Sequence, residues 1–275
     1  MPEKTILHKQ ARTILTKASG FLEGYSHTLN PYVGCVYGCS YCYVRKMPIA
    51  LFREESWGDY VDVKSNAKSL LIKELQREKQ KGPVTIFMSS STDPYQPIEY
   101  KEELTRNLLE ALAVDPPDFL FIQTRSPMVT RDLDLFQKLK ERLLVSITIE
   151  TDDDSIRKQF SPQAPAIRGR LRALKELHTN DIQTQAAIAP LLPSSPNFPA
   201  ILREHTSRIT IDDFFMGDGS GGKRTKQLNI QNRYKPEHVT HWYDETAYKK
   251  LLRRFQQEFR DEELFISQQG FLPPT

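Results

Sequence analysis

The 275-residue sequence predicts an α/β fold in which parallel strands alternate with helices, as a partial barrel or an open sheet. Two observations support this prediction. Runs rich in β-forming residues alternate with amphipathic helical stretches, and six such units are too few to close an eight-stranded barrel. The composition, with 39% hydrophobic and 27% charged residues, is that of a globular protein. In either arrangement the reactive groups are expected at the C-terminal ends of the strands.

Six runs rich in β-branched and aromatic residues are the predicted strands. They lie at 27–33, 84–89, 119–124, 143–150, 182–189 and 209–215. Because helical stretches separate them, neighbouring strands are expected to pair in parallel through right-handed crossovers.

The predicted helices have apolar residues at intervals of three or four positions. They lie at 66–80, 100–114, 130–141, 165–178 and 244–259, and 197–205 is a short approach to the sixth strand. Leu104, Leu108 and Leu112 are one example of this spacing. The pairs Gly82-Pro83 and Pro116-Pro117 mark helix ends, since neither pair continues a helix well.

The chain divides into three predicted parts. Residues 1–26 are polar and weakly patterned and are expected to form an N-terminal extension, 27–215 hold the alternating units, and 216–275 add a loop and a helix that complete one side of the barrel. No run of eighteen apolar residues and no signal-peptide core occurs, so we expect a cytoplasmic protein without a membrane span. The net charge of +3 is too small to indicate nucleic acid binding by itself.

The three cysteines, Cys35, Cys39 and Cys42, all fall within eight residues. A disulfide framework does not fit, because the count is odd and the rest of the chain has no partner for a third thiol. Gly34, Gly38 and Ser40 indicate that the cysteines lie in a loop directly after the first predicted strand. The cluster of thiols therefore favours a metal site.

Two metals are compatible with this loop. Three thiolates can hold three irons of a [4Fe–4S] cluster and leave the fourth iron open to a small-molecule ligand. Zinc is the competing metal, but a structural zinc takes four ligands, and the fourth would be remote, such as His8 or His27. A non-catalytic zinc-binding module thus stays open as an alternative.

The Cys-x3-Cys-x2-Cys spacing, with Tyr41 just before the last cysteine, resembles the radical S-adenosylmethionine (radical SAM) superfamily. More closely, the chain is similar to the spore photoproduct lyase-like, or DNA repair photolyase-like, family. The matching stretches are residues 30–43 (NPYVGCVYGCSYCY), 91–99 (STDPYQPIE), 124–126 (TRS), 131–133 (RDL), 160–162 (FSP) and 187–190 (AIAP).

The resemblance implies a partial (β/α)6 TIM-like barrel of the radical SAM type over residues 27–215. It implies one [4Fe–4S] cluster on Cys35, Cys39 and Cys42, with S-adenosylmethionine as co-substrate. The implied reaction is reductive cleavage to a 5′-deoxyadenosyl radical, which abstracts hydrogen from the substrate. A lyase-like DNA repair activity on DNA or another nucleic acid is expected. The expected electron donor is a reductant such as flavodoxin or ferredoxin.

Polar and small residues at the predicted strand ends are candidates for binding S-adenosylmethionine. They are Tyr41, Ser90, Thr92, Asp93, Arg125, Thr148, Glu150 and Ala189. Arg125 suits a carboxylate or a ribose, because a guanidinium pairs bidentately with a carboxylate. Glu150 suits ribose hydroxyls, with a structural ion pair to Arg125 as the alternative.

The hydrogen donor is a departure from the family pattern. Usual bacterial spore photoproduct lyases have a cysteine where this sequence has Ser90, and a serine O–H bond is too strong to replace a thiol. Tyr41, Tyr43 or Tyr95 is therefore the candidate catalytic donor, or the reaction differs. Packing around the cluster is the alternative role for the two tyrosines that flank Cys42.

A basic and aromatic segment near the C-terminus is the candidate contact for nucleic acid. Lys223, Arg224, Lys226, Arg233 and Lys235 occur without an intervening acid, beside Tyr234, Trp242 and Tyr243. A solvated basic loop is the alternative. A radical SAM enzyme acting on a small molecule or a peptide also stays open.

Overall fold

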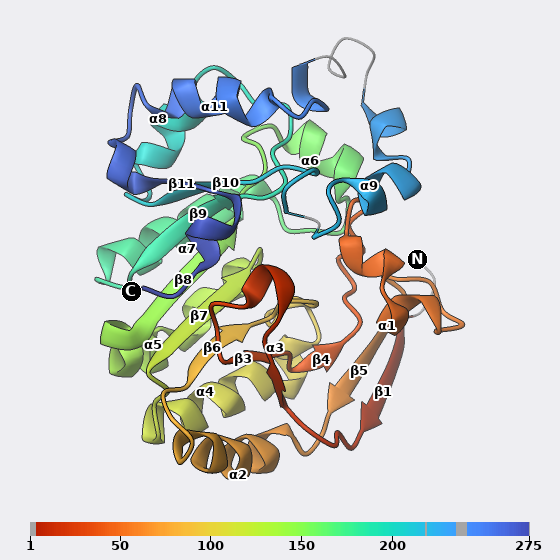
Figure 1. The fold of residues 1–275 in the computed structure, drawn as a ribbon, viewed down its shortest axis with the longest axis vertical. Helices are drawn as coiled ribbons and strands as arrows, with labels where there is room; N and C mark the ends of the chain where they lie inside the picture. The colour runs from red at the N-terminus through yellow and green to blue at the C-terminus, as the bar shows by residue number, and fades with distance from the viewer. Residues whose placement is uncertain (1–3, 218, 235–240, 275) are drawn as a thin grey trace.

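In the computed structural model, the described residues are 4–217, 219–234 and 241–274, and within them a curved eight-stranded sheet forms the centre of the molecule. Its strand order is β11-β10-β9-β8-β7-β6-β3-β2. All neighbouring strands pair in parallel except β2, which pairs antiparallel with β3. Figure 1 shows the strands following one another around a partial barrel, and the predicted fold class is confirmed.

The strands of this sheet are β2 (Leu15–Lys17), β3 (His27–Leu29), β6 (Thr85–Met88), β7 (Phe119–Thr124), β8 (Leu143–Thr148), β9 (Thr184–Ile188), β10 (Ile209–Ile211) and β11 (Leu264–Ile266). A smaller sheet beside it joins β1 (Thr5–Lys9), β5 (Tyr60–Lys64) and β4 (Tyr32–Val33).

The helices cover the outer face of the barrel and its ends (Figure 1). They are α1 (Pro48–Leu51), α2 (Ala67–Lys79), α3 (Glu99–Glu102), α4 (Leu104–Val114), α5 (Leu133–Leu139), α6 (Asp154–Phe160), α7 (Ile167–Thr179), α8 (Phe198–Arg203), α9 (Lys223–Gln227) and α11 (Ala247–Phe255). Short 3-10 helices include η1 (Gly20–Leu22), η2 (Tyr43–Lys46), η3 (Pro127–Asp132) and η7 (Ser267–Phe271). No helix in the described part of the chain has the length and apolarity needed to cross a membrane.

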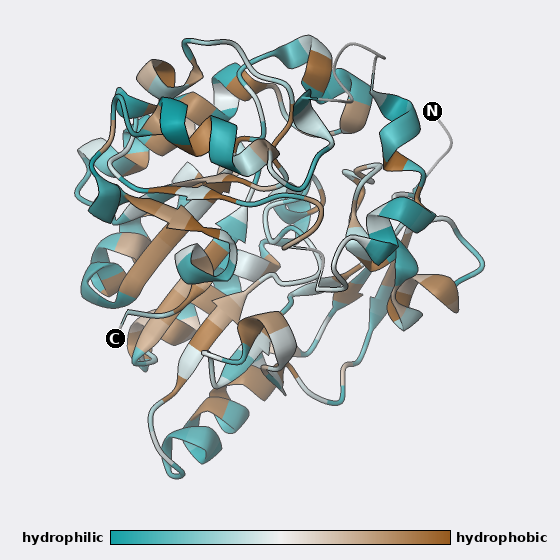
Figure 2. Cartoon of the chain, turned by 45° about the horizontal axis from the view of Figure 1, so that its top comes forward, coloured by the Kyte–Doolittle hydropathy of each residue, from teal (hydrophilic) through white to brown (hydrophobic). Residues whose placement is uncertain are grey.

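Successive residues of the central strands face opposite sides of the sheet, as a pleated strand requires. Leu120 and Ile122 of β7 join the large core beneath the helices, whereas Phe119 and Phe121 point into the barrel. Phe87 of β6 stacks on Phe121 there, with ring centroids 4.8 Å apart. The apolar colour of the strands in Figure 2 reflects this burial on both faces.

Several predicted boundaries were wrong. The first predicted strand divides into β3 and β4, because Pro31 has no N–H for a sheet ladder and β4 joins the smaller sheet. The helix expected over 100–114 breaks at Glu103, whose φ is +47°. Residues 197–205 contain helix α8, and the short strands β1, β2, β5 and β11 and helix α6 were missed.

Candidate active site

The C-terminal ends of the barrel strands surround a cavity of about 600 Å³. All three cysteines line it, together with Ser89 and Ser90 after β6 and Arg125 after β7. The expectation that the reactive groups gather at this end of the sheet agrees with the geometry.

The cysteine loop depends on Gly34, the residue before Cys35. Gly34 has a φ of +90°, and a Cβ placed there would lie 2.4 Å from the carbonyl oxygen of Tyr60. Two turns then bring the thiols to one side: Gly38 N–H donates to Cys35 O at 3.1 Å, and Cys42 N–H donates to Cys39 O at 3.2 Å. The sequence thus forms a compact loop whose three cysteines all line the cavity.

The thiols are free and poorly solvated. Cys35 and Cys39 are buried, and burial raises the pKa of Cys42 to about 11 and that of Cys35 above its ordinary value as well. Bare thiolates are unfavourable in such a place, whereas a metal cluster supplies the positive charge that stabilises them. The donor set therefore fits an iron–sulfur cluster.

Zinc and an iron–sulfur cluster need different ligand arrangements. In the ranges that the structure describes, no three His, Cys, Asp or Glu side chains converge on one metal-ion position. A structural zinc needs its ligands around a single ion. In a [4Fe–4S] cluster each cysteine binds a different iron, so the three sulfur atoms are spread apart.

Arg125 connects the cysteine loop to the barrel. Its Nη1 donates to Cys39 Sγ at 3.1 Å, to the Tyr41 hydroxyl at 2.8 Å and to Glu150 Oε1 at 2.7 Å. The Tyr41 hydroxyl in turn donates to Glu150, whose other oxygen accepts from Arg170 Nη1 at 2.6 Å. Burial would raise the pKa of Glu150, but Arg170 and Arg125 outweigh it and hold that pKa below its usual value.

Asp93 organises the turn after β6. It accepts hydrogen bonds from the Thr124 hydroxyl at 2.7 Å and from the backbone N–H groups of Arg125 and Tyr95 at 2.8 and 2.9 Å. Burial raises its pKa despite these donors. Asp93 borders the cavity, and its hydrogen bonds fasten the ends of β6 and β7 together.

Ser90 and Thr92 present hydroxyl groups beside the same cavity. Ser90 Oγ accepts from Asn30 Nδ2 at 3.1 Å, and the Ser90 carbonyl accepts from the Tyr43 hydroxyl. The buried Thr92 Oγ1 has no hydrogen-bond partner among the described residues. An unsatisfied buried hydroxyl at a cavity wall suits a polar ligand that supplies the missing bond.

The predicted site residues fall into two groups. Tyr41, Tyr43, Ser90, Thr92, Asp93, Arg125, Thr148 and Ala189 border the cavity. Tyr95 does not: it is fully buried in the core beneath the helices, and its hydroxyl donates to Asp132 at 3.0 Å. Glu150 also lies behind the wall, in the ion pair that was the alternative to ribose binding.

Part of the wall comes from residues that sequence reasoning missed. The segment Thr16–Leu22 of the N-terminal extension, Asp212–Phe214 after β10, and Phe271 from the C-terminal end all line the cavity. Only Asp212–Phe214 had a signal, because they end a predicted strand. No local pattern indicates that η1 and η7 meet at the barrel.

One residue of the basic segment reaches the cavity. Helix α9 packs against η2, the turn that follows Cys42, and Arg224 lines the cavity. Lys223, Lys226 and Arg233 are exposed. Lys235 lies outside the described residues. Tyr234 is buried against Phe160, with ring centroids 4.9 Å apart.

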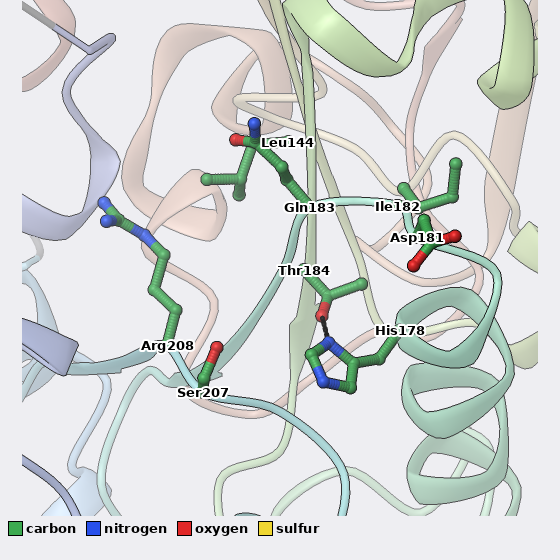
Figure 3. Close-up of a pocket in the computed structure, with 8 residues that line it drawn as sticks. All are labelled: Leu144, His178, Asp181, Ile182, Gln183, Thr184, Ser207 and Arg208. Carbon is green, nitrogen blue, oxygen red and sulfur yellow. Dashed lines mark hydrogen bonds between the residues drawn. The ribbon is translucent and has the colours of Figure 1, made fainter.

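A second cavity, of about 390 Å³, opens where β9 begins, at the opposite end of the strand from Ala189. Figure 3 shows it beside the end of α7, where His178 and Thr184 interact at 3.5 Å. No cysteine lines it, so the first cavity is the candidate active site.

Comparisons with known proteins agree with this geometry. The family model described as "Radical SAM superfamily" matches residues 29–195. An uncharacterised protein of Methanocaldococcus jannaschii is 33% identical over 231 residues, which cover 84% of this chain and 85% of the relative. An uncharacterised protein of Acidianus two-tailed virus is 30% identical over 172 residues, covering 60% and 56% of the two chains.

Among solved structures, a complex of spore photoproduct lyase with dinucleoside spore photoproduct superposes with a TM-score of 0.65 at 15% identity, covering 95% of this chain and 81% of that one. SuiB of Streptococcus suis bound to S-adenosylmethionine superposes with a TM-score of 0.53 at 12% identity, covering 87% and 46%. At these identities the likeness is one of fold.

Proposed function

The chain belongs to the radical SAM superfamily, and from this premise we propose that it abstracts a hydrogen atom from a nucleic acid, as a spore photoproduct lyase-like enzyme. The cofactors of this superfamily are a [4Fe–4S] cluster and S-adenosylmethionine. When bound, they supply an electron and a 5′-deoxyadenosyl radical. The observation that carries the proposal is that all three cysteines line one cavity, together with Arg224 from the basic helix α9.

In this proposal Cys35, Cys39 and Cys42 would hold the cluster at the cavity that all three line. Ser90, Thr92 and Arg125 then bind the polar groups of S-adenosylmethionine, with Thr148 and Ala189 along the wall. The unsatisfied hydroxyl of Thr92 and the guanidinium of Arg125 support this assignment. Phe21, Phe87 and Phe271 also line the cavity, and their apolar rings exclude water from it, which protects a radical from quenching.

Hydrogen return to the substrate is assigned to Tyr41 or Tyr43. Both border the cavity, and both hydroxyl groups donate to fixed acceptors, Glu150 and the Ser90 carbonyl. Tyr95 is not assigned the role of hydrogen donor, because it is buried in the core on the helix side of the sheet. Its place in the sequence, four residues after Ser91, gave no hint of this orientation.

The proposal also divides the chain into a core and two flanks. Residues 27–215 form the catalytic core, and both flanks contribute to its wall. The lining role of Thr16–Leu22 and Phe271 supports a covering function for the flanks. An external reductant is required by this superfamily, and flavodoxin or ferredoxin is the proposed class.

Turnover tests the enzymatic part of the proposal. The anaerobically reconstituted protein is mixed with S-adenosylmethionine and dithionite, and 5′-deoxyadenosine is measured. We expect brown protein with about four irons per chain and formation of 5′-deoxyadenosine. A colourless protein holding one zinc would instead establish the binding-module alternative.

Salt-dependent binding of oligonucleotides tests the substrate class. We expect Lys223→Gln/Lys226→Gln to weaken binding and to lower the slope of log K against log salt by about 1 per lysine. Lys138→Gln/Lys175→Gln, which removes the same charge from the exposed surfaces of α5 and α7, is the matched control. Equal effects of both pairs, or no binding at low salt, would favour a small-molecule or peptide substrate.

A further inference from the structure

The side chain of Arg125 has a contact that binding S-adenosylmethionine does not require. Its Nη1 lies 3.1 Å from Cys39 Sγ, within the range for a hydrogen bond to sulfur. Cys39 is one of the three cluster ligands assigned above. The same nitrogen also contacts the Tyr41 hydroxyl and Glu150, so its position is fixed by the protein before any ligand arrives.

The charged side chains behind Arg125 are buried, whereas the Arg125 side chain itself is 17% exposed. Glu150 lies between Arg125 and Arg170, and the side-chain exposures of Glu150 and Arg170 are 1% and 0%. Arg170 is further held by the carbonyls of Thr148 and Pro165, at 3.0 and 2.9 Å. Arg125, Arg170 and Glu150 taken together carry a net charge of +1, which water screens little in these surroundings. The Asp93 carboxyl, which accepts from the Arg125 backbone N–H at 2.8 Å, lies outside this triad.

We propose that Arg125, backed by Glu150 and Arg170, sets the reduction potential of the cluster through its hydrogen bond to Cys39. Hydrogen bonds to the ligand sulfurs and the net charge nearby are two determinants of iron–sulfur potentials. One electron passes from the external reductant to the cluster, and no bond forms or breaks at Arg125. A nearby cation stabilises the added negative charge, so Arg125 raises the potential and makes this reduction easier.

Glu150 modulates the effect of Arg125. The Arg125 guanidinium contacts Cys39 directly, whereas the Glu150 carboxylate contacts only the guanidinium in this pair of contacts and carries the opposite charge. Removing the negative charge should therefore shift the potential upward, by less than the downward shift from losing Arg125. These opposite signs distinguish electrostatic tuning from a general loosening of the site, which would move both variants in the same direction.

The measurement is a redox titration of the reconstituted cluster, followed by electron paramagnetic resonance, without S-adenosylmethionine or substrate. We expect Arg125→Gln to lower the equilibrium constant for one-electron reduction by about tenfold, a shift of ~59 mV. Glu150→Gln should raise the potential. The double variant Arg125→Gln/Glu150→Gln should lie between Arg125→Gln and the wild type, and it removes both partners in case Arg125→Gln alone fails to fold.

The control is Arg106→Gln, which removes an arginine from an ion pair with Asp132, away from the residues that line the cavity. It should leave the potential unchanged. A wild-type potential in both Arg125→Gln and the double variant would overturn the proposal, and Arg125 would then only bind S-adenosylmethionine. The inference rests on the cysteine ligands and not on the nucleic acid substrate, so failure to bind oligonucleotides leaves it standing. If the wild-type protein takes up no cluster, both the proposed function and the inference about the reduction potential are overturned.

Discussion

At the scale of single residues, the cysteine loop shows how much a short motif specifies. The three thiols occur within eight residues, so their grouping is visible without any knowledge of the fold. Their surroundings are not visible in this way: the arginine that contacts Cys39 lies 86 residues further along the chain. The ligand set is therefore local information, whereas the electrostatics of the site are long-range information.

Substitution of a single cysteine tests the ligand set. Cys35→Ala, Cys39→Ala and Cys42→Ala should each abolish 5′-deoxyadenosine formation and reduce bound iron, because two thiolates cannot hold the cluster at three corners. Iron content and absorbance near 400 nm are measured after reconstitution. Ser40→Ala, within the same loop, is the control and should keep the wild-type iron content and absorbance. Turnover surviving in any cysteine variant would contradict the assignment.

Gly34 offers a test that leaves all thiols in place. Gly34→Ala should prevent cluster uptake, because the new Cβ would meet the Tyr60 carbonyl at 2.4 Å and its ring at 2.7 Å, which displaces the loop. Iron content is the measurement. Gly82→Ala is the control, since Gly82 also has a positive φ, +145°, but open space around it. Equal iron content in Gly34→Ala and wild type would contradict this prediction, because the loop would then accommodate the added Cβ without losing the cluster.

At the scale of elements, the long periodic segments were predicted well and the short ones were not. Helices α2 and α7 agree with the predicted stretches to within two residues at each end. Helix α6 was missed, although the Phe160 carbonyl at its end accepts from the backbone N–H of Ser40 at 3.0 Å and so braces the cysteine loop. Seven residues contain too few turns to produce a clear apolar period.

The pH dependence of stability tests a side-chain interaction within α6, the hydrogen bond between Asp154 and Arg157. Asp154 accepts from Arg157 Nε at 2.6 Å, and this hydrogen bond lowers the pKa of Asp154 from 3.8 to about 2. A depressed pKa means that the ionised carboxylate stabilises the folded state above pH ~4, and that this contribution is lost as the pH falls towards 2.

Asp154→Asn should therefore lower the free energy of unfolding by about 1 kcal/mol at pH 7, a modest value because the carboxylate is partly exposed. Urea unfolding at pH 7, 4 and 3 is the measurement. The gap between the variant and the wild type should narrow as the pH falls. If the difference in free energy of unfolding widens or stays constant as the pH falls, the charge of Asp154 is not the cause of the difference.

At the scale of the whole molecule, η1 of the N-terminal extension and η7 near the C-terminus meet at the barrel. Gln268 Nε2 donates to the carbonyl of Phe21 at 2.8 Å, and the rings of Phe21 and Phe271 lie 5.8 Å apart. Phe271 also contacts Phe121 inside the barrel, at 6.0 Å. Because β2 and β11 are the outer strands of the sheet, η1 and η7 connect its two edges.

Removal of one ring tests this connection. Phe271→Ala should lower the free energy of unfolding by about 3–5 kcal/mol, because a buried aromatic side chain is replaced by a cavity. Urea unfolding measures the loss. Leu272→Ala is the control, and its effect should be much smaller because Leu272 is 37% exposed. Equal losses in the two variants would mean that Phe271 is not a core residue of the barrel.

The sequence by itself determined the α/β class, the order of the main strands and helices, and the cysteine motif, because periodicity and spacing are written in neighbouring residues. Only the tertiary structure decided that Arg125 contacts Cys39, that Glu150 lies behind the cavity wall, that Tyr95 is turned away from it, and that Thr16–Leu22 and Phe271 line it. Each of these depends on contacts between segments distant along the chain, which are set by how the barrel curves and by which face of a strand a side chain occupies.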